Sequence, residues 1–318
     1  MKILVPLNNK KDISNFAKAG ANEVYLGFYD NKWTEQFGKY ADLNRMSGFG
    51  SKANQYDFDN LVEIIKEIKD FGMSAFITLN ANCYSKEQIA FIENFYLPVL
   101  KKIVDGIITS DVILATKIIE FGIPVVASTM MGVYNFDIAF YYYKLGIKRM
   151  IVPRDLSLEE IESIHTNLPE VHLEAFFMRN GCVFSDGFCL GMHRPECGSV
   201  CGGLNSARRV METSFEDFKN LHDIELNSEL YHCYFHRWAC AMCALYRLKK
   251  IGVESLKIVG RADAPWAVCD DIKVTKSNIK LIERCGTEKE YLENMIFPSQ
   301  GISKCRMGFS CYYPEVRF

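Results

Sequence analysis

The stretch FGIPVVAST at Phe121–Thr129 contains the pattern that decides the fold: a helix end marked by glycine, a short link and an apolar strand. The same phrase recurs as AGANEVYLGF (Ala19–Phe28), FGMSAFITLN (Phe71–Asn80), LGIKRMIVPRD (Leu145–Asp155) and IGVESLKIVGR (Ile251–Arg261). Glycine suits a helix C-terminus because the left-handed conformation there costs it no Cβ clash. The apolar runs do not alternate with polar residues, which is typical of parallel strands buried on both faces. The repeats therefore predict strands that alternate with helices.

Eight such strands are expected along the chain, and helical patterns lie between the first seven. Their ranges are Ile3–Pro6, Glu23–Phe28, Ala75–Asn80, Gly106–Ser110, Pro124–Ser128, Arg149–Pro153, His172–Phe177 and Ser255–Val259. Eight strand units that alternate with helices favour a closed (β/α)₈ barrel of the TIM type over an open doubly wound sheet. No GxGxxG or GxxxxGK[ST] motif follows a predicted strand, so the usual dinucleotide-binding and P-loop signatures are absent.

The connection between the seventh and eighth strands is unusually long. We expect a barrel over residues 1–261 that includes a cysteine-rich insertion at 180–253, and a short C-terminal extension, 262–318, that packs on the barrel. Loops of that length in a compact domain are usually functional. Barrel enzymes carry their chemistry at the C-terminal ends of the strands, so the insertion is expected on the catalytic face.

Composition indicates an ordinary globular protein. The 318 residues are 49% hydrophobic and 24% charged, with a formal net charge of −2 at pH 7. This balance argues against a dedicated DNA- or RNA-binding protein, although a local basic patch could still contact RNA. The longest uncharged run, Phe121–Phe136, is too short and too polar to span a membrane. With no signal-peptide pattern at the N-terminus, a cytoplasmic location is expected.

The cysteines are concentrated in one part of the chain. Seven of the twelve lie between Cys182 and Cys243, and only Cys83 precedes them. In a reducing cytosol, clustered cysteines are more often metal ligands or catalytic thiols than disulfides. A structural zinc site normally has two CxxC-like pairs, whereas only Cys240 and Cys243 form one here. Spacing alone thus favours an iron–sulfur cluster and leaves zinc, inert cysteines and disulfides open.

Polar side chains within or just after the predicted strands are candidate catalytic residues. They are Asn80, Asp111, Arg154, Glu174, Lys257 and Arg261. Glu174 and Lys257 fall inside buried strands, where a charge must be paired, so they either act directly in catalysis or pair with each other inside the barrel. Arg154 and Arg261 could hold a carboxylate or a phosphate through two parallel hydrogen bonds, or could form salt bridges at the rim.

Four motifs in this chain follow a family pattern in order and spacing, over about the first 261 residues. They are AGANEVYLG (Ala19–Gly27), LEAFFMRNGCVFSDGFC (Leu173–Cys189), ECGSVC (Glu196–Cys201) and SLKIVGR (Ser255–Arg261). Together they resemble the peptidase U32 family. The pattern differs at one position, because Val259 stands where the family's KIEGR motif has Glu.

The resemblance implies a [4Fe–4S] cluster and oxygen-independent hydroxylation of an RNA base or a small aromatic precursor, with prephenate as the oxygen donor in some members. Matched position by position, the implied ligands are Cys182, Cys189, Cys197 and Cys240, with Cys201, Cys233 and Cys243 as alternates. Arg154 and Arg261 would then hold the anionic group of prephenate or RNA. RNA, a small aromatic molecule or a paralogous U32 protein is the expected partner, and DNA is not.

Two further functions fit the same resemblance: a U32-type peptidase, and a non-catalytic iron–sulfur accessory subunit that works with a paralogue. No HExxH, GxSxG or Cys–His signature supports hydrolysis. The C-terminal run CRMGFSCYYPE adds Cys305 and Cys311, which could cap the barrel or contribute with Cys243 to a second metal site.

Overall fold

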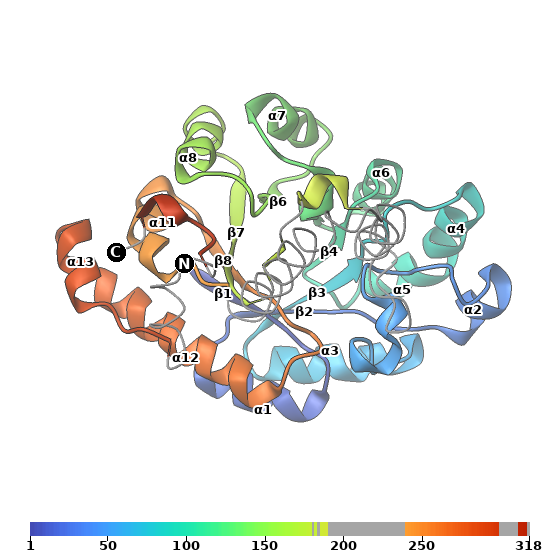
Figure 1. Ribbon diagram of the computed structural model, residues 1–318. Coiled ribbons are helices and arrows are strands. Elements are labelled where there is room, and N and C mark those ends of the chain that lie inside the picture. Colours follow the sequence, from blue (N-terminus) through green and yellow to red (C-terminus); the bar gives the residue numbers. More distant parts are fainter. Residues whose placement is uncertain (180, 183–184, 190–238, 299–310, 317–318) are drawn as a thin grey trace, which may run out of the picture.

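Eight parallel strands close into a barrel in the chain order β1 to β8 (Figure 1). The computed structural model describes residues 1–179, 181–182, 185–189, 239–298 and 311–316. The strands are β1 Lys2–Pro6, β2 Glu23–Leu26, β3 Ser74–Leu79, β4 Gly106–Thr109, β5 Val125–Ala127, β6 Arg149–Ile151, β7 His172–Met178 and β8 Ser255–Ile258. The predicted TIM-type barrel is therefore confirmed.

Most predicted strands run one or two residues past the observed C-terminal end. Phe28 and Val152, for example, follow β2 and β6 but are 1% exposed. Apolar residues beyond the last ladder hydrogen bond still pack at the top of the barrel. The hydrophobic pattern in the sequence indicates which residues are buried, whereas the strand ends at the last residue that pairs with a neighbouring strand.

Helices surround the barrel, as Figure 1 shows. They are α1 Ile13–Ala19, α2 Asn31–Phe37, α3 Leu61–Asp70, α4 Lys86–Phe91, α5 Leu97–Leu100, α6 Val112–Glu120, α7 Phe136–Lys144, α8 Leu158–Asn167, α11 Leu245–Ile251, α12 Pro265–Ile282 and α13 Glu288–Asn294. Helix α3 illustrates why they form: Leu61, Ile64, Ile65 and Ile68 recur at helical spacing and are all buried against the barrel. None of the described helices is both long and apolar enough to cross a membrane.

Helix α12 is the first element of the predicted extension at 262–318. It packs on β1 and β8 and lies between α11 and α1 (Figure 1). Helix α12, at the start of the extension, thus covers the side of the barrel formed by β8 and β1. The division of the chain at residue 261 stays a prediction.

Three chain segments meet at the end of β7. Met178 forms an antiparallel bridge with Cys240, and Cys240 forms a parallel bridge with Cys311. The long connection from β7 to β8 and the C-terminal segment are therefore joined where the predicted catalytic face begins. Of the cysteines named from sequence, Cys197, Cys201, Cys233 and Cys305 lie outside the described residues.

Candidate functional site

A cavity of about 380 Å³ lies at the C-terminal ends of the strands. Five of the candidate site residues predicted from sequence line it, and these are Asn80, Arg154, Cys182, Lys257 and Arg261. Because all strands of the barrel are parallel, their C-terminal ends meet at one face, which brings these distant residues together. The lining also includes Arg45 and Thr78, which are absent from the predicted set.

Asp186 connects two arginines at the edge of this cavity. Arg154 Nε donates to Asp186 Oδ2 at 2.6 Å, and Arg45 Nη1 donates to Oδ1 at 3.2 Å. Burial by itself would raise the pKa of Asp186, but the two guanidinium groups hold that pKa below its ordinary value. Arg154 also lies 4.1 Å from the centroid of the Phe176 ring. The guanidinium of Arg154 is thus already engaged by a carboxylate of the chain itself.

Arg45 also reaches the second of the implied cluster ligands. Its Nη2 lies 3.3 Å from Cys189 Sγ, and Asn82 Nδ2 donates to the carbonyl oxygen of Cys189 at 2.6 Å. Arg45 lies in the loop after β2 and α2, and no motif marks it. Its one sequence signal is that it follows a barrel strand, where loops carry functional residues.

Cys240 forms a bridge with Met178 at the end of β7, and its Sγ accepts from the backbone N–H of Met242 at 3.3 Å. Burial raises the pKa of Tyr312, whose backbone N–H donates to the carbonyl oxygen of Cys240 at 3.0 Å. Within the described ranges, no three His, Cys, Asp or Glu side chains converge as a metal site. The ligand roles of Cys182, Cys189 and Cys240 stay predictions.

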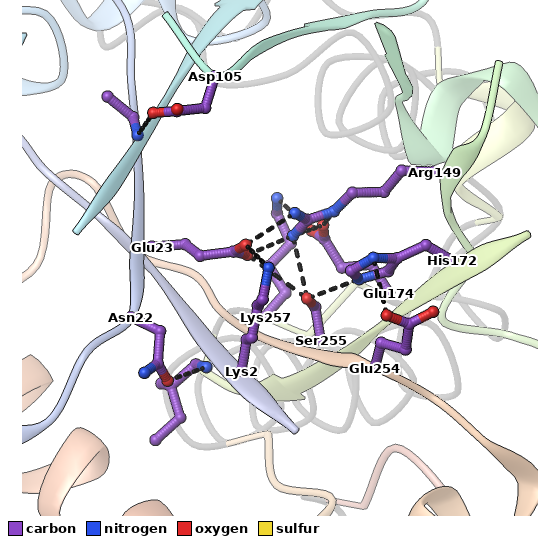
Figure 2. A network of polar contacts seen from close by, with 12 residues as sticks. Lys2, Asn22, Glu23, Asp105, Arg149, His172, Glu174, Glu254, Ser255 and Lys257 are labelled. Atoms are coloured by element: carbon purple, nitrogen blue, oxygen red, sulfur yellow. Dashed lines mark hydrogen bonds and ion pairs between the residues drawn. The ribbon is translucent and has the colours of Figure 1, made fainter. Parts of the chain in front are cut away.

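Glu174 and Lys257 form an ion pair inside the barrel, with Lys257 Nζ at 2.9 Å from Glu174 Oε1. Figure 2 shows that this pair belongs to a larger network centred on Arg149, which lies in β6. Arg149 donates to Glu174 at 3.0 Å and to both carboxylate oxygens of Glu23, at 3.0 and 2.6 Å. Ser255 also accepts from Arg149, at 3.1 Å. The pair was expected from sequence as one alternative, but its links to Glu23 and Arg149 were not.

The network is buried and its charges are matched. Glu174 is 0% and Glu23 1% exposed. Burial would raise the pKa of Glu174, but Lys257 and Arg149 together hold that pKa below its ordinary value. Burial, together with the positive charge of Arg149 and Arg261, lowers the pKa of Lys257 despite its pairing with Glu174. The network forms the floor of the cavity, because Lys257 both lines the cavity and contacts Glu174.

Asn80 and Asp111, the other two candidates, have different surroundings. Asn80 lines the cavity, and its Oδ1 accepts from the backbone N–H of Arg45 at 3.3 Å. Asp111 is the N-cap of α6, because its Oδ1 accepts from Leu114 N–H at 2.9 Å. Its Oδ2 accepts from Tyr84 N–H at 3.2 Å, so both oxygens serve local structure away from the cavity lining.

The chain is similar to a known protein family and to several known proteins. The model of Peptidase family U32 matches residues 8–316. A collagenase of Porphyromonas gingivalis is 23% identical over 289 residues, which cover 84% of this chain and 63% of that protein. The tRNA hydroxylation protein P of Escherichia coli is 28% identical over 175 residues, which cover 53% of this chain and 38% of that protein. The chain thus spans less than two thirds of either relative.

Among solved structures, the U32 peptidase Mk0906 superposes with a TM-score of 0.50 at 13% sequence identity. The superposition covers 82% of this chain and 93% of that one. At this identity the likeness concerns the fold, and it agrees with the barrel described above.

Replacement of Arg149 by Met should be strongly destabilising, because it leaves Glu23 and Glu174 buried without their shared cation. We expect the free energy of unfolding to fall by about 3 kcal/mol or more, measured by urea denaturation. Arg247→Met is the matched control, since Arg247 makes a similar bond to Glu288 at the surface, and it should cost about 0–1 kcal/mol. Equal losses in the two variants would contradict the importance of the network.

Replacement of Glu174 by Gln should lower the free energy of unfolding by an amount that depends on pH. The pKa of Glu174 in the folded protein lies below its ordinary 4.5, so its contribution is complete above that value and is lost as pH falls through the folded pKa. The gap in unfolding free energy between wild type and variant should therefore be widest near pH 7 and should shrink below about pH 4.5. A gap that stays constant down to acid pH would show that the charge is unimportant.

Proposed function

Because the chain belongs to peptidase family U32, we propose that it is an iron–sulfur enzyme that modifies an RNA base or a small aromatic precursor by oxygen-independent hydroxylation. The observation that carries this proposal is the cavity at the catalytic face of the barrel, which has Cys182 in its lining and several cations beside it. Similarity to the tRNA hydroxylation protein P supports the reaction class. The thiols suit the reducing conditions of the cytoplasm, where we place the protein.

The proposed ligands of a [4Fe–4S] cluster are Cys182, Cys189, Cys197 and Cys240. Cysteine thiolates are the usual ligands of such clusters. Cys182 lines the cavity, and Cys189 lies beside it through its contact with Arg45. The donor chemistry therefore fits the cluster. When bound, it would supply electron transfer or a Lewis acid next to the cavity.

The chain's own side chains would orient the substrate and the cysteine segment. Arg45 donates to the sulfur of Cys189, and Asp186 holds Arg45 and Arg154 in place. An anionic oxygen donor such as prephenate would meet Arg261 in the cavity, and its guanidinium attracts a carboxylate. A paralogous U32 protein is a possible partner in the reaction.

Anaerobic purification tests the cluster. We expect a brown protein with about four iron and four sulfide per chain, measured by chemical quantification and by EPR after reduction. Cys182→Ala and Cys189→Ala should lose most of the iron. Cys269→Ala is the control, because Cys269 lies on the outer helix α12 and is no proposed ligand, so it should keep the full content. A colourless wild type, or full iron in the first two variants, would contradict the proposal.

Activity separates hydroxylation from the other two functions. Incubated without oxygen with a reductant, prephenate and tRNA, the loaded protein should produce a nucleoside with one added oxygen, detected by mass spectrometry. Likeness to the collagenase of Porphyromonas gingivalis makes gelatin the comparison substrate. Cleavage of gelatin without any change in RNA would favour a peptidase. Hydroxylation only after a second U32 protein is added would favour an accessory subunit.

A further inference from the structure

We propose that Tyr312 is a positioning residue for the cysteine site, where it fixes the segment that carries Cys240 against the chain that leads from β7 to Cys182. Its importance for a bound cluster rests on the proposed function, whereas the positioning itself can be measured in the iron-free protein. Three features of the structure support this role: the pairing of the chain segments, the bonds of the Tyr312 side chain and the backbone conformation of Arg179.

Three short segments pair side by side beyond the end of β7, and the middle one carries Cys240. On one side, the backbone N–H of Arg179 donates to the carbonyl oxygen of Ala239 at 2.6 Å. On the other side, Cys240 forms a bridge with Cys311, and its carbonyl oxygen accepts from the backbone N–H of Tyr312 at 3.0 Å. The segment that carries Cys240 is therefore held along both of its edges.

The side chain of Tyr312 adds a bond to the far segment. Its phenol hydroxyl donates to the carbonyl oxygen of Arg179, so this one residue binds both of the other segments. The ring is 4% exposed and stacks on Phe176, with the two centroids 6.1 Å apart and the planes at 25°. Burial raises the pKa of the phenol, so the hydroxyl stays protonated near pH 7 and remains a hydrogen-bond donor.

Tyr312 can serve as an anchor because its own segment is attached to the barrel elsewhere. Its neighbours Tyr313 and Val316 are buried. Glu315 Oε1 accepts from the backbone N–H of Leu158, at the start of α8, at 2.9 Å. The position of Tyr312 is thus supported by contacts that involve no cysteine.

The backbone of Arg179 shows what the bond from Tyr312 holds in place. Arg179 has a φ of 67°, and among the described residues it is the one other than glycine with a positive φ. This left-handed conformation is unfavourable for a residue with a Cβ atom and persists where the surroundings hold it. Here the N–H of Arg179 bonds to Ala239 and its carbonyl oxygen to Tyr312. Since Cys182 follows three residues later, this turn sets the direction in which the chain leaves β7.

The hydroxyl group separates positioning from simple packing. Tyr312→Phe keeps the ring on Phe176 and the backbone bond to Cys240, and it removes only the bond to the carbonyl oxygen of Arg179. If Tyr312 acted only by filling space, this variant would behave like wild type. If it positions the two cysteine segments, loss of one oxygen atom is enough to loosen them.

Hydrogen exchange of the iron-free full chain, followed by mass spectrometry, tests the positioning. In Tyr312→Phe, peptides that contain residues 177–179 and 239–241 should exchange roughly 10-fold faster than in wild type. Tyr142→Phe is the matched control, because Tyr142 makes the same kind of bond, to the carbonyl oxygen of Met131 at 2.9 Å, and it should leave both peptides unchanged. Unchanged exchange in Tyr312→Phe, or equal acceleration in the control, would overturn the inference.

Release of iron to a chelator tests the role of Tyr312 toward the cluster. After anaerobic loading with iron and sulfide, Tyr312→Phe should lose iron roughly 10-fold faster than wild type, as expected when a group that orients metal ligands is removed. Its EPR spectrum after reduction should also differ from that of wild type, whereas Tyr142→Phe should match wild type in both measurements. Equal release rates and spectra in all three proteins would refute the role toward the cluster. A wild type that binds no iron would contradict the proposed function, and the exchange experiment would still decide the positioning.

Discussion

The interaction on which the barrel depends is the bond between Arg149 and Glu23. These residues lie on β6 and β2, on opposite sides of the closed sheet, so the bond crosses the interior of the barrel. A barrel floor made of charged groups is stable only when every charge is matched, because an unpaired ion there costs several kcal/mol (roughly 3–5). Strands β7 and β8 must therefore pair in the register that brings Lys257 within hydrogen-bond distance of Glu174.

That floor also sets the electrostatics of the cavity above it. Glu174 neutralises Lys257, while Asp186 at the rim holds Arg45 and Arg154. Among the described residues of the lining, Arg261 is then the cation that forms no ion pair.

The cysteine segments are attached to this same scaffold. Backbone bridges join Cys240 to Met178 at the end of β7 and to Cys311 near the C-terminus. Arg45, held by Asp186, reaches Cys189 from the loop after β2 and α2. A change in the ion pairs of Asp186 would therefore affect both the cavity lining and the contact between Arg45 and Cys189.

The sequence by itself determined the barrel, because helix-ending glycines followed by apolar runs are local patterns. It also placed Asn80, Arg154 and Lys257 at one face, since parallel strands bring their C-terminal ends together. Only the tertiary structure decided which charges are paired, and it assigned Asp111 to a helix cap. Ion pairing depends on strand register and on contacts between segments far apart in the chain, as between Arg45 and Asp186. No local pattern of residues encodes those distances.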